Sequence, residues 1–366
     1  MECALLDNIR FWIGLNHIDG ISRRVYKSLI QRFGSAGAVF SASVEELSTV
    51  EGFKKGAILA IKRFNEWRDV EEEIRLIEHH KISVITIRDN NFPQNLLAID
   101  DPPPYLYAKG SIFKEDNTAV AVVGTRNPSY YGVRMAEDIA MGLAYAGVNV
   151  VSGLARGIDS AAHRGALRGK GRTIAVLGCG IDIVYPPENK KLFEEITLNG
   201  AVVSEFPIGT PPAPQNFPMR NRIISGMSLG VLVVEASMGS GSLITANLAL
   251  EYGRDVFALP GAITSEKSKG TNKLIKEGAK LVESVDDILA ELPVTGNISI
   301  NRGKAEVINL SPEERNILEL LEGEPLFIDT IIHETRLQPA RVNSILLDME
   351  IKGLIGQQPG KVFYKK

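Results

Sequence analysis

Seven short apolar runs recur through the middle of the chain, and amphipathic segments separate them. The runs cover residues 119–124, 148–153, 173–178, 201–205, 229–235, 255–260 and 279–282. Between them, segments such as 132–146 and 243–252 space their apolar residues as one face of a helix does. Apolar strands that alternate with helices are typical of a parallel sheet covered on both faces. The pattern predicts a doubly wound α/β fold, in which ligands bind beyond the carboxyl ends of the strands.

The first 90 residues instead predict short helices joined by glycine-containing turns. Helices are expected at 23–33 and 55–64, each after an apolar-x-Gly-apolar turn at Gly20 or Gly52. Such turns favour a helix-hairpin-helix repeat, where glycine permits a tight turn and backbone N–H groups at the next helix can meet phosphate. A small helical bundle without a ligand explains the pattern equally well, so both interpretations stay open.

The last 62 residues predict a winged helix, with three helices followed by a two-stranded hairpin. Ser311 and Pro312 form a strong helix start. The later helices are expected at 328–335 and 339–352. The third helix often reads DNA in such modules, yet here its basic and acidic residues balance. DNA binding, protein contact and a structural role stay open for this module.

Pro-containing linkers divide the chain into blocks. A helical domain is predicted at 1–90, a linker and lead-in at 91–117, the α/β domain at 118–291, a linker at 292–304 and the winged helix at 305–366. The net charge is −3, from 41 basic and 44 acidic residues, which excludes a uniformly basic coat for nucleic acid. The excess acid lies in the flanks, because residues 118–290 carry 17 basic and 16 acidic side chains. A focused basic pocket is therefore compatible with the composition.

The composition also limits which cofactors and which cellular compartment are expected. Cys3 and Cys179 are the only cysteines, so neither a disulfide framework nor a zinc site is expected, and no cofactor is predicted. No apolar run approaches the ~18–20 residues that span a bilayer. The start of the chain lacks the pattern of a signal peptide. We expect a cytoplasmic protein that does not associate with membranes.

The first two strand-end loops carry candidate phosphate contacts. The first contains Gly124, Thr125 and Arg126, and its arginine offers a bidentate fork for phosphate. It matches neither the dinucleotide fingerprint nor the Walker A loop. Pairing of Arg126 with a neighbouring carboxylate is the alternative. The second loop begins Ser152-Gly153, where glycine permits close approach of a ligand.

The remaining strand-end loops add cations, an aromatic ring and hydroxyl groups. The candidates are Asn189, Lys190, Lys191, Phe217, Arg220, Asn221, Arg222, Gly239, Ser240, Gly241, Ser242, Thr245 and Lys273. Phe217 can stack on a base while guanidinium groups bind phosphates, although a place for Phe217 in the core is the alternative. The Gly/Ser run suits a phosphate nest. No carboxylates form a catalytic set, so the pattern favours phosphate binding over catalysis.

These segments together closely resemble the DNA-processing protein A family of bacterial natural transformation, also called Smf. The matching segments lie at 121–126, 152–159, 175–180 with 185–186 and 189–190, 217–224, 239–245 and 253–261, and they occur in the same order. The flanks resemble the longer family members, with a SAM-like or helix-hairpin-helix domain first and a winged helix last. The resemblance covers most of the chain.

The resemblance implies an extended Rossmann-like fold that binds single-stranded DNA and forms a homodimer through that domain. It implies loading of a RecA-type recombinase onto incoming strands, and no catalysis. Arg126 and Lys190 align with a positive pocket for the DNA backbone. Thr125 stands where serine is common, and Gly239 stands where relatives can carry a basic residue, which implies a lower affinity here.

Two alternatives are weighed against this function. One is a nucleotide-acting enzyme of the lysine-decarboxylase-like, phosphoribohydrolase type. Those enzymes carry a Pro-Gly-Gly-x-Gly-Thr-x-x-Glu motif, whereas residues 239–245 offer no glutamate. The other is a DNA-bound scaffold that acts mainly through protein contacts.

Overall fold

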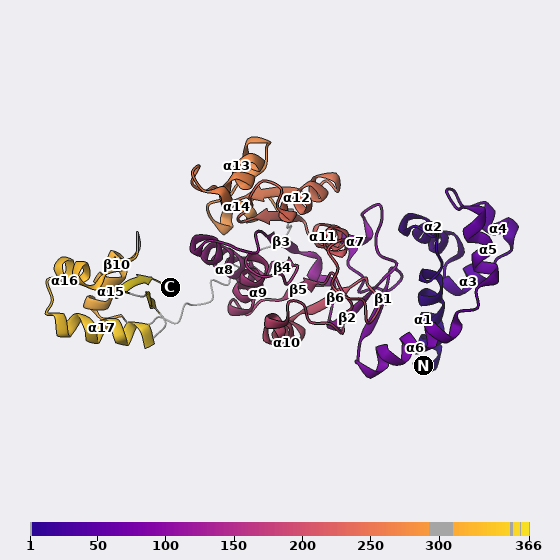
Figure 1. Ribbon diagram of the computed structural model, residues 1–366, viewed down its shortest axis with the longest axis horizontal. Helices are drawn as coiled ribbons and strands as arrows, with labels where there is room; N and C mark the ends of the chain where they lie inside the picture. The colour runs from indigo at the N-terminus through magenta and orange to yellow at the C-terminus, as the bar shows by residue number, and fades with distance from the viewer. Residues whose placement is uncertain (1, 293–309, 352–353, 359, 366) are drawn as a thin grey trace. The chain divides into compact units, whose positions relative to one another are not determined.

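The computed structural model describes residues 2–292, 310–351, 354–358 and 360–365 (Figure 1). The chain divides into two compact units, Met1–Asn301 and Arg302–Lys366. The first unit contains a helical domain and a nine-stranded sheet, and the second is a small winged helix. Among the described helices, none combines the length and the apolar content that crossing a bilayer requires.

The large sheet has the order β1-β2-β6-β5-β4-β3-β7-β8-β9. Its strands are β1 (Ser83–Thr86), β2 (Tyr105–Gly110), β3 (Ala119–Val123), β4 (Asn149–Ser152), β5 (Thr173–Val176), β6 (Ala201–Ser204), β7 (Gly230–Val233), β8 (Asp255–Ala258) and β9 (Lys280–Leu281). All seven predicted strands, β3 to β9, are present and pair in parallel. The strand order reverses at β3, so the loops after β3 and β7 flank a switch point of the Rossmann type.

The sheet begins earlier than the α/β domain predicted at 118–291. Strands β1 and β2 pair with each other in antiparallel register, and β2 pairs in the same way with β6. Ser83–Thr86 therefore belongs to the sheet although it lies inside the range predicted for the helical domain. Tyr105–Gly110 lies inside the predicted lead-in. Short strands outside the βα alternation lack the signal that located the others.

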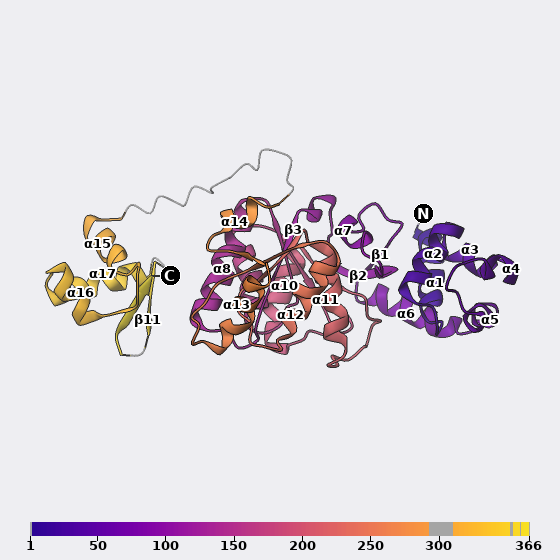
Figure 2. The same ribbon diagram turned by 90° about the horizontal axis from the view of Figure 1, so that it is seen from above.

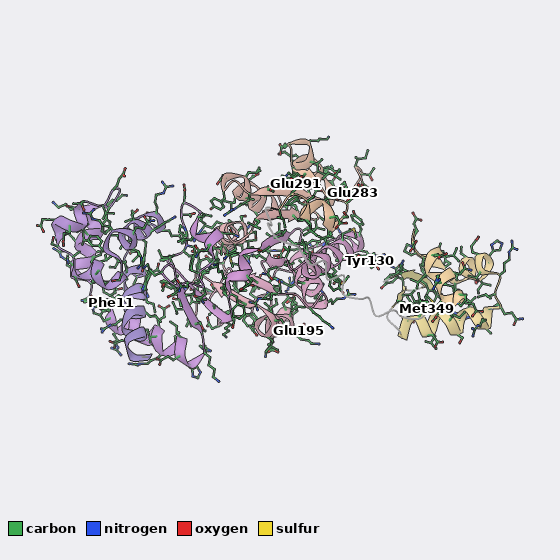
Figure 3. The ribbon with its side chains drawn as sticks, turned by 180° about the vertical axis from the view of Figure 1, so that it is seen from behind. Phe11, Tyr130, Glu195, Glu283, Glu291 and Met349 are labelled. Atoms are coloured by element: carbon green, nitrogen blue, oxygen red, sulfur yellow. The ribbon has the colours of Figure 1, made fainter. Side chains whose placement is uncertain are left out.

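Helices cover both faces of the sheet (Figures 1 and 2). Alternate residues of β3 divide between two cores, with Val120 and Val122 in one and Ala121 and Val123 in the other. The first core includes α8 (Tyr130–Tyr145), α9 (Ile158–Arg168) and α14 (Val285–Leu289). The second includes α7 (Gln94–Leu97), α11 (Asn216–Met227), α12 (Gly241–Glu251) and α13 (Lys269–Lys276). Figure 3 marks the start of α8 at Tyr130 and places Glu195 on α10 (Lys190–Asn199).

The helical domain comprises α1 (Glu2–Asn16), α2 (Arg23–Phe33), α3 (Ala36–Ser41), α4 (Val44–Ser48), α5 (Lys55–Arg63) and α6 (Trp67–His79). The predicted turns before α2 and α5 place Gly20 at φ 87° and Gly52 at φ 73°, in the left-handed region that favours glycine. The domain shares one apolar cluster with the sheet and α10. Across this contact, the Tyr107 hydroxyl of β2 donates to Glu73 of α6. The contact between the helical domain and the sheet therefore combines apolar packing with a buried hydrogen bond.

The second unit has the predicted winged-helix elements. Helices α15 (Pro312–Leu320), α16 (Ile328–Thr335) and α17 (Pro339–Ile351) precede the hairpin of β11 (Ile355–Gln358) and β12 (Val362–Lys365), and β10 (Leu326–Phe327) pairs with β12. Ser311 and Glu314 form a capping box at α15. On α17, Arg341 pairs with Glu313 of α15 at 3.0 Å between Nε and Oε2. The Lys352 predicted for the third helix lies outside the described residues. One basic group of the third helix is thus already neutralised.

Candidate nucleic-acid interface

A cleft of about 600 Å³ lies at the carboxyl edge of the sheet, beside the switch point. The loop after β3, the start of α9, Tyr185, the start of α11 and the start of α12 form its walls. Its polar lining consists of Thr125, Arg126, Asp159, Tyr185, Arg220, Asn221, Ser240, Ser242 and Thr245. The topology therefore gathers loops that are far apart in the sequence.

The loop after β3 carries Arg126 to the rim of this cleft. Gly124 is required there, because a Cβ atom would lie 2.6 Å from Ile158 Cγ1 and 2.9 Å from the Glu235 carbonyl oxygen. The Thr125 amide donates to that same oxygen at 2.8 Å. The Arg126 side chain is exposed, and among the described residues it forms no ion pair with a carboxylate. The predicted alternative, a carboxylate partner for Arg126, is not what the structure shows.

Arg126 instead lies against an aromatic pair. Its guanidinium carbon is 5.1 Å from the centroid of the Phe217 ring, a cation–π distance. The Tyr185 ring lies 5.8 Å from Phe217 with a 39° tilt. Phe217 packs tightly over Gly178, where a Cβ atom would approach within 2.8 Å of the ring. Because Phe217 is only half-buried and lines the cleft, its ring is accessible from it.

Arg220 occupies the floor of the cleft and is 4% exposed. Its Nη1 donates to the carbonyl oxygens of Gly153, at 2.7 Å, and Val176, so the side chain ties the ends of β4 and β5 together. A side chain at Gly153 would collide with this guanidinium. Burial lowers the pKa of Arg220 to about 10, with Arg126 lowering it further and Asp159 opposing the shift. Arg220 thus supports the site from beneath.

Asp159 and His163 on α9 are structural neighbours of the cleft. Burial raises the pKa of the Asp159 carboxyl, while the positive charge of Arg220 and the amide of Ala155 oppose that shift. His163 Nδ1 lies 2.7 Å from Thr173 Oγ1, and burial lowers the pKa of this imidazole to about 3. His163 is therefore neutral at physiological pH and hydrogen-bonded within the core.

The loop before α10 contributes less to the cleft than the sequence suggests. Asn189 is buried, and its Nδ2 donates to the Leu154 carbonyl oxygen and to Ser160 Oγ at 2.9 Å each. Lys190 and Lys191 are exposed at the start of α10, and Lys191 Nζ lies 3.8 Å from Glu195. None of the three lines the cleft. Tyr185, four residues earlier, does.

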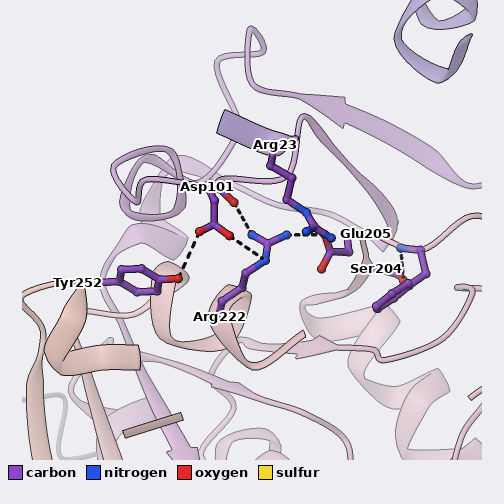
Figure 4. Close-up of polar contacts among 7 residues, drawn as sticks. Arg23, Asp101, Ser204, Glu205, Arg222 and Tyr252 are labelled. Carbon is purple, nitrogen blue, oxygen red and sulfur yellow. Dashed lines mark hydrogen bonds and ion pairs between the residues drawn. The ribbon is translucent and has the colours of Figure 1, made fainter. Parts of the chain in front are cut away.

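Arg222 points away from the cleft. Residues two apart on a helix differ by about 200° in direction, so Arg220 and Arg222 cannot face the same ligand. Arg222 faces a second cavity, of about 940 Å³, between the helical domain and the sheet. There its guanidinium binds Glu205 and the Asp101 carbonyl oxygen, the latter at 2.6 Å (Figure 4). Arg23 of α2 reaches the same carboxylate at 2.7 Å.

Glu205 is expected to be a large contributor to stability at this junction. Its side chain is 4% exposed and balances Arg222, which is 6% exposed. Glu205→Ala removes the nearer and more buried carboxylate from the Arg222 guanidinium and leaves it with Asp101, whose Oδ2 lies 3.6 Å away; it is expected to cost about 3–5 kcal/mol of unfolding free energy. Chemical denaturation measures this loss. Asp100→Ala, which breaks the exposed pair with Arg24 in the same cavity, is the matched control and should cost under about 1 kcal/mol. Equal losses in both variants would contradict the assignment.

The Gly/Ser loop and the remaining predicted residues divide between the cleft and its support. Ser240 caps α12, and Ser240, Gly241, Ser242 and Thr245 line the cleft, whereas Gly239 does not. Ser152 is buried and donates to the Val122 carbonyl oxygen at 2.7 Å. Lys273 on α13 lies outside the lining and pairs with Glu277 at 3.5 Å. Three residues that shape the site are absent from the predicted candidates: Tyr185, Gly178 and Glu235. A lone acid at the end of an apolar strand was the available signal for Glu235.

The fold and this cleft define a class: a Rossmann-like α/β protein with a cation–aromatic cleft at the switch point. The DNA recombination-mediator protein A family matches residues 83–293, and the winged-helix domain model of the same family matches residues 304–361. The chain belongs to this family. The Protein Smf of Synechocystis is 35% identical, over 97% of this chain and 98% of its own length.

Solved structures agree with this assignment. The DNA processing protein A of Streptococcus pneumoniae superposes with a TM-score of 0.69 at 36% identity, covering 78% of this chain and 99% of that one. The Helicobacter pylori protein, described by its single-stranded DNA binding mode, has a TM-score of 0.52 at 33% identity, covering 57% of this chain and 94% of that one.

Proposed function

We propose that this protein binds single-stranded DNA in the cleft at the carboxyl edge of its sheet, as a recombination mediator in natural transformation. The observation that carries the proposal is the exposed Arg126 guanidinium against the accessible Phe217 ring. A guanidinium binds phosphate and an aromatic ring stacks on a base, and together they match one nucleotide of an unpaired strand. The single-stranded DNA binding of the Helicobacter pylori relative supports it.

The predicted residues divide into those that would contact DNA, those that support the cleft and those that lie outside it. Gly124, Thr125, Arg126, Phe217, Asn221, Ser240, Gly241, Ser242 and Thr245 line it and form the contact surface we propose. Ser152, Gly153, Asn189 and Arg220 hold the strand ends and loops beneath it. Lys190 and Lys191 extend the path of the backbone along α10. Arg222 belongs to the domain junction, and Gly239 and Lys273 lie beyond the lining.

Single-strand preference follows from the aromatic contact. In a duplex each base is stacked on its neighbours, whereas a base in a single strand is free to stack on Phe217. The few cations of the cleft engage few phosphates per subunit. Strong binding therefore requires several subunits on one strand. We propose that the protein is a cytoplasmic homodimer through its sheet domain and delivers the strand to a RecA-type recombinase.

Fluorescence anisotropy with labelled oligo(dT), over a series of salt concentrations, tests this function. Single-strand affinity should exceed that for a duplex of equal length by at least about tenfold, the value of roughly one base stack. The slope of log K against log salt should be about −1.4 to −2, which corresponds to two or three phosphates. Equal affinity for both DNAs would overturn the proposal.

The proposal includes no catalytic step. Asp159, the carboxylate in the cleft lining, is hydrogen-bonded to a backbone amide beneath the site. Incubation with nucleoside monophosphates and chromatography for free base tests the phosphoribohydrolase alternative. Turnover of base release would displace the binding function as the main activity.

A further inference from the structure

Glu235 is a buried carboxylate whose role is given neither by the fold nor by the DNA cleft. It follows β7 and is 4% exposed. One carboxylate oxygen, Oε2, accepts the Ser129 amide at 2.8 Å, and Oε1 accepts the Ser129 hydroxyl. Ser129 is the N-cap of α8, and its Oγ accepts the Gly132 amide at 3.0 Å. The carboxylate therefore lies directly at the N-terminus of α8.

That position is the one where Rossmann folds bind an anion. The N-terminus of the helix after the first strand presents N–H groups and the positive end of the helix dipole, which favours phosphate. In this protein the Glu235 carboxylate occupies that position. A Cβ atom on Gly132 would lie 2.5 Å from Glu235 Cδ, so the carboxylate packs directly against the first turn. No room is left for a phosphate group in that turn.

Glu235 also holds both ends of the loop that carries Arg126. Its backbone oxygen accepts the Thr125 amide at 2.8 Å, and its side chain binds Ser129 at the other end. Arg126 lies between these anchors. The loop is thus fixed to the neighbouring strand at two points, and the direction in which Arg126 leaves the backbone is set by them.

We infer that Glu235 is a positioning residue for DNA binding: an internal anion that takes the phosphate place of α8 and holds the 124–129 loop so that Arg126 faces the cleft. The inference rests on the proposed function of that cleft. The inference explains why the Arg126 side chain, and not the backbone, would bind phosphate at the switch point. The Glu235 carboxylate already neutralises the backbone N–H groups at the start of α8.

The variant Glu235→Ala of the full chain tests this, with acetate as a replacement carboxylate. Loss of the carboxylate leaves the Ser129 amide unpaired, and oligo(dT) affinity should fall about 5- to 100-fold. Acetate, compared with chloride at equal ionic strength, should restore several-fold of that affinity in the variant and leave the unaltered protein unchanged. A purely structural role would not make DNA affinity respond to acetate.

The matched control is Asp116→Asn. Asp116 is also buried, accepts a backbone amide at 2.8 Å and binds Arg172, but it precedes β3 at the other end of the sheet. This variant should lower the melting temperature and leave oligo(dT) affinity within about twofold. Glu235→Gln keeps the volume of the side chain and one acceptor. It should bind with an intermediate affinity that does not respond to acetate, and it carries the test if the alanine variant does not fold.

The outcomes separate the inference from the function beneath it. If the unaltered protein does not bind oligo(dT), the proposed function fails. If it binds and the folded Glu235 variants bind equally well, the function stands and the positioning role is overturned. An affinity loss without acetate rescue in a folded Glu235→Ala protein would likewise overturn the role of an internal anion.

Discussion

Replacing Arg126 by glutamate is expected to weaken oligo(dT) binding by at least about 100-fold at low salt. The substitution removes a phosphate contact and places a negative charge where the strand backbone passes, so attraction becomes repulsion. It also removes the cation that lies against Phe217. Because Arg126 is exposed, the free energy of unfolding should change by no more than about 0.5 kcal/mol. Anisotropy titration and chemical denaturation measure the two quantities.

Arg75→Glu provides the matched control for Arg126→Glu. Arg75 is an exposed arginine on α6 in the helical domain, so the change in net charge is the same without a change in the cleft. Its affinity should remain within about threefold of the unaltered protein, the residual being long-range electrostatics. The milder Arg126→Ala should make the salt slope shallower by about 0.7, the value of one single-strand phosphate. Equal losses for Arg126→Glu and Arg75→Glu would place the strand outside the cleft.

The sheet and the edge where the cleft lies could be predicted from the sequence, because both follow from short-range pattern. A strand such as Ala119–Val123, buried on both faces, must be apolar throughout, and helices between such strands impose parallel pairing. Parallel pairing places all strand-end loops on one edge. The candidates Thr125, Phe217 and Ser242 therefore meet in one cleft although they are distant in the chain.

Side-chain direction and burial could not be predicted in the same way. Within Arg220-Asn221-Arg222, all three residues are polar and look equivalent as ligands, but the helix turns one arginine under the cleft and the other into the domain junction. Which partner each finds depends on carbonyl groups of β4 and β5 and on Glu205, none of which is local in sequence. Asn189 is similar, because its amide satisfies buried groups of another loop.

Replacing Arg220 by alanine is expected to cost about 3–5 kcal/mol of stability and most of the DNA affinity, although the residue lies beneath the contact surface. The substitution leaves the Gly153 and Val176 carbonyl oxygens without their donor and removes the positive charge that stabilises ionised Asp159. The Arg220 side chain then no longer supports the ends of β4 and β5 or the Phe217 ring. Denaturation and anisotropy titration measure both effects.

The salt dependence separates this support from direct contact with phosphate. If Arg220 acts only beneath the cleft, Arg220→Ala lowers affinity but keeps the salt slope of the unaltered protein, whereas Arg126→Ala makes the slope shallower. Arg220→Lys should fall between, because an ammonium group keeps the positive charge beside Asp159 but loses the planar guanidinium whose Nη1 donates to both carbonyl oxygens. A stable Arg220→Ala protein whose slope is shallower by about 0.7 would show instead that Arg220 contacts the strand. Arg126 and Arg220 are alike as candidate phosphate contacts in the sequence. The salt slope and the unfolding curve of each alanine variant distinguish contact with the strand from support beneath the cleft.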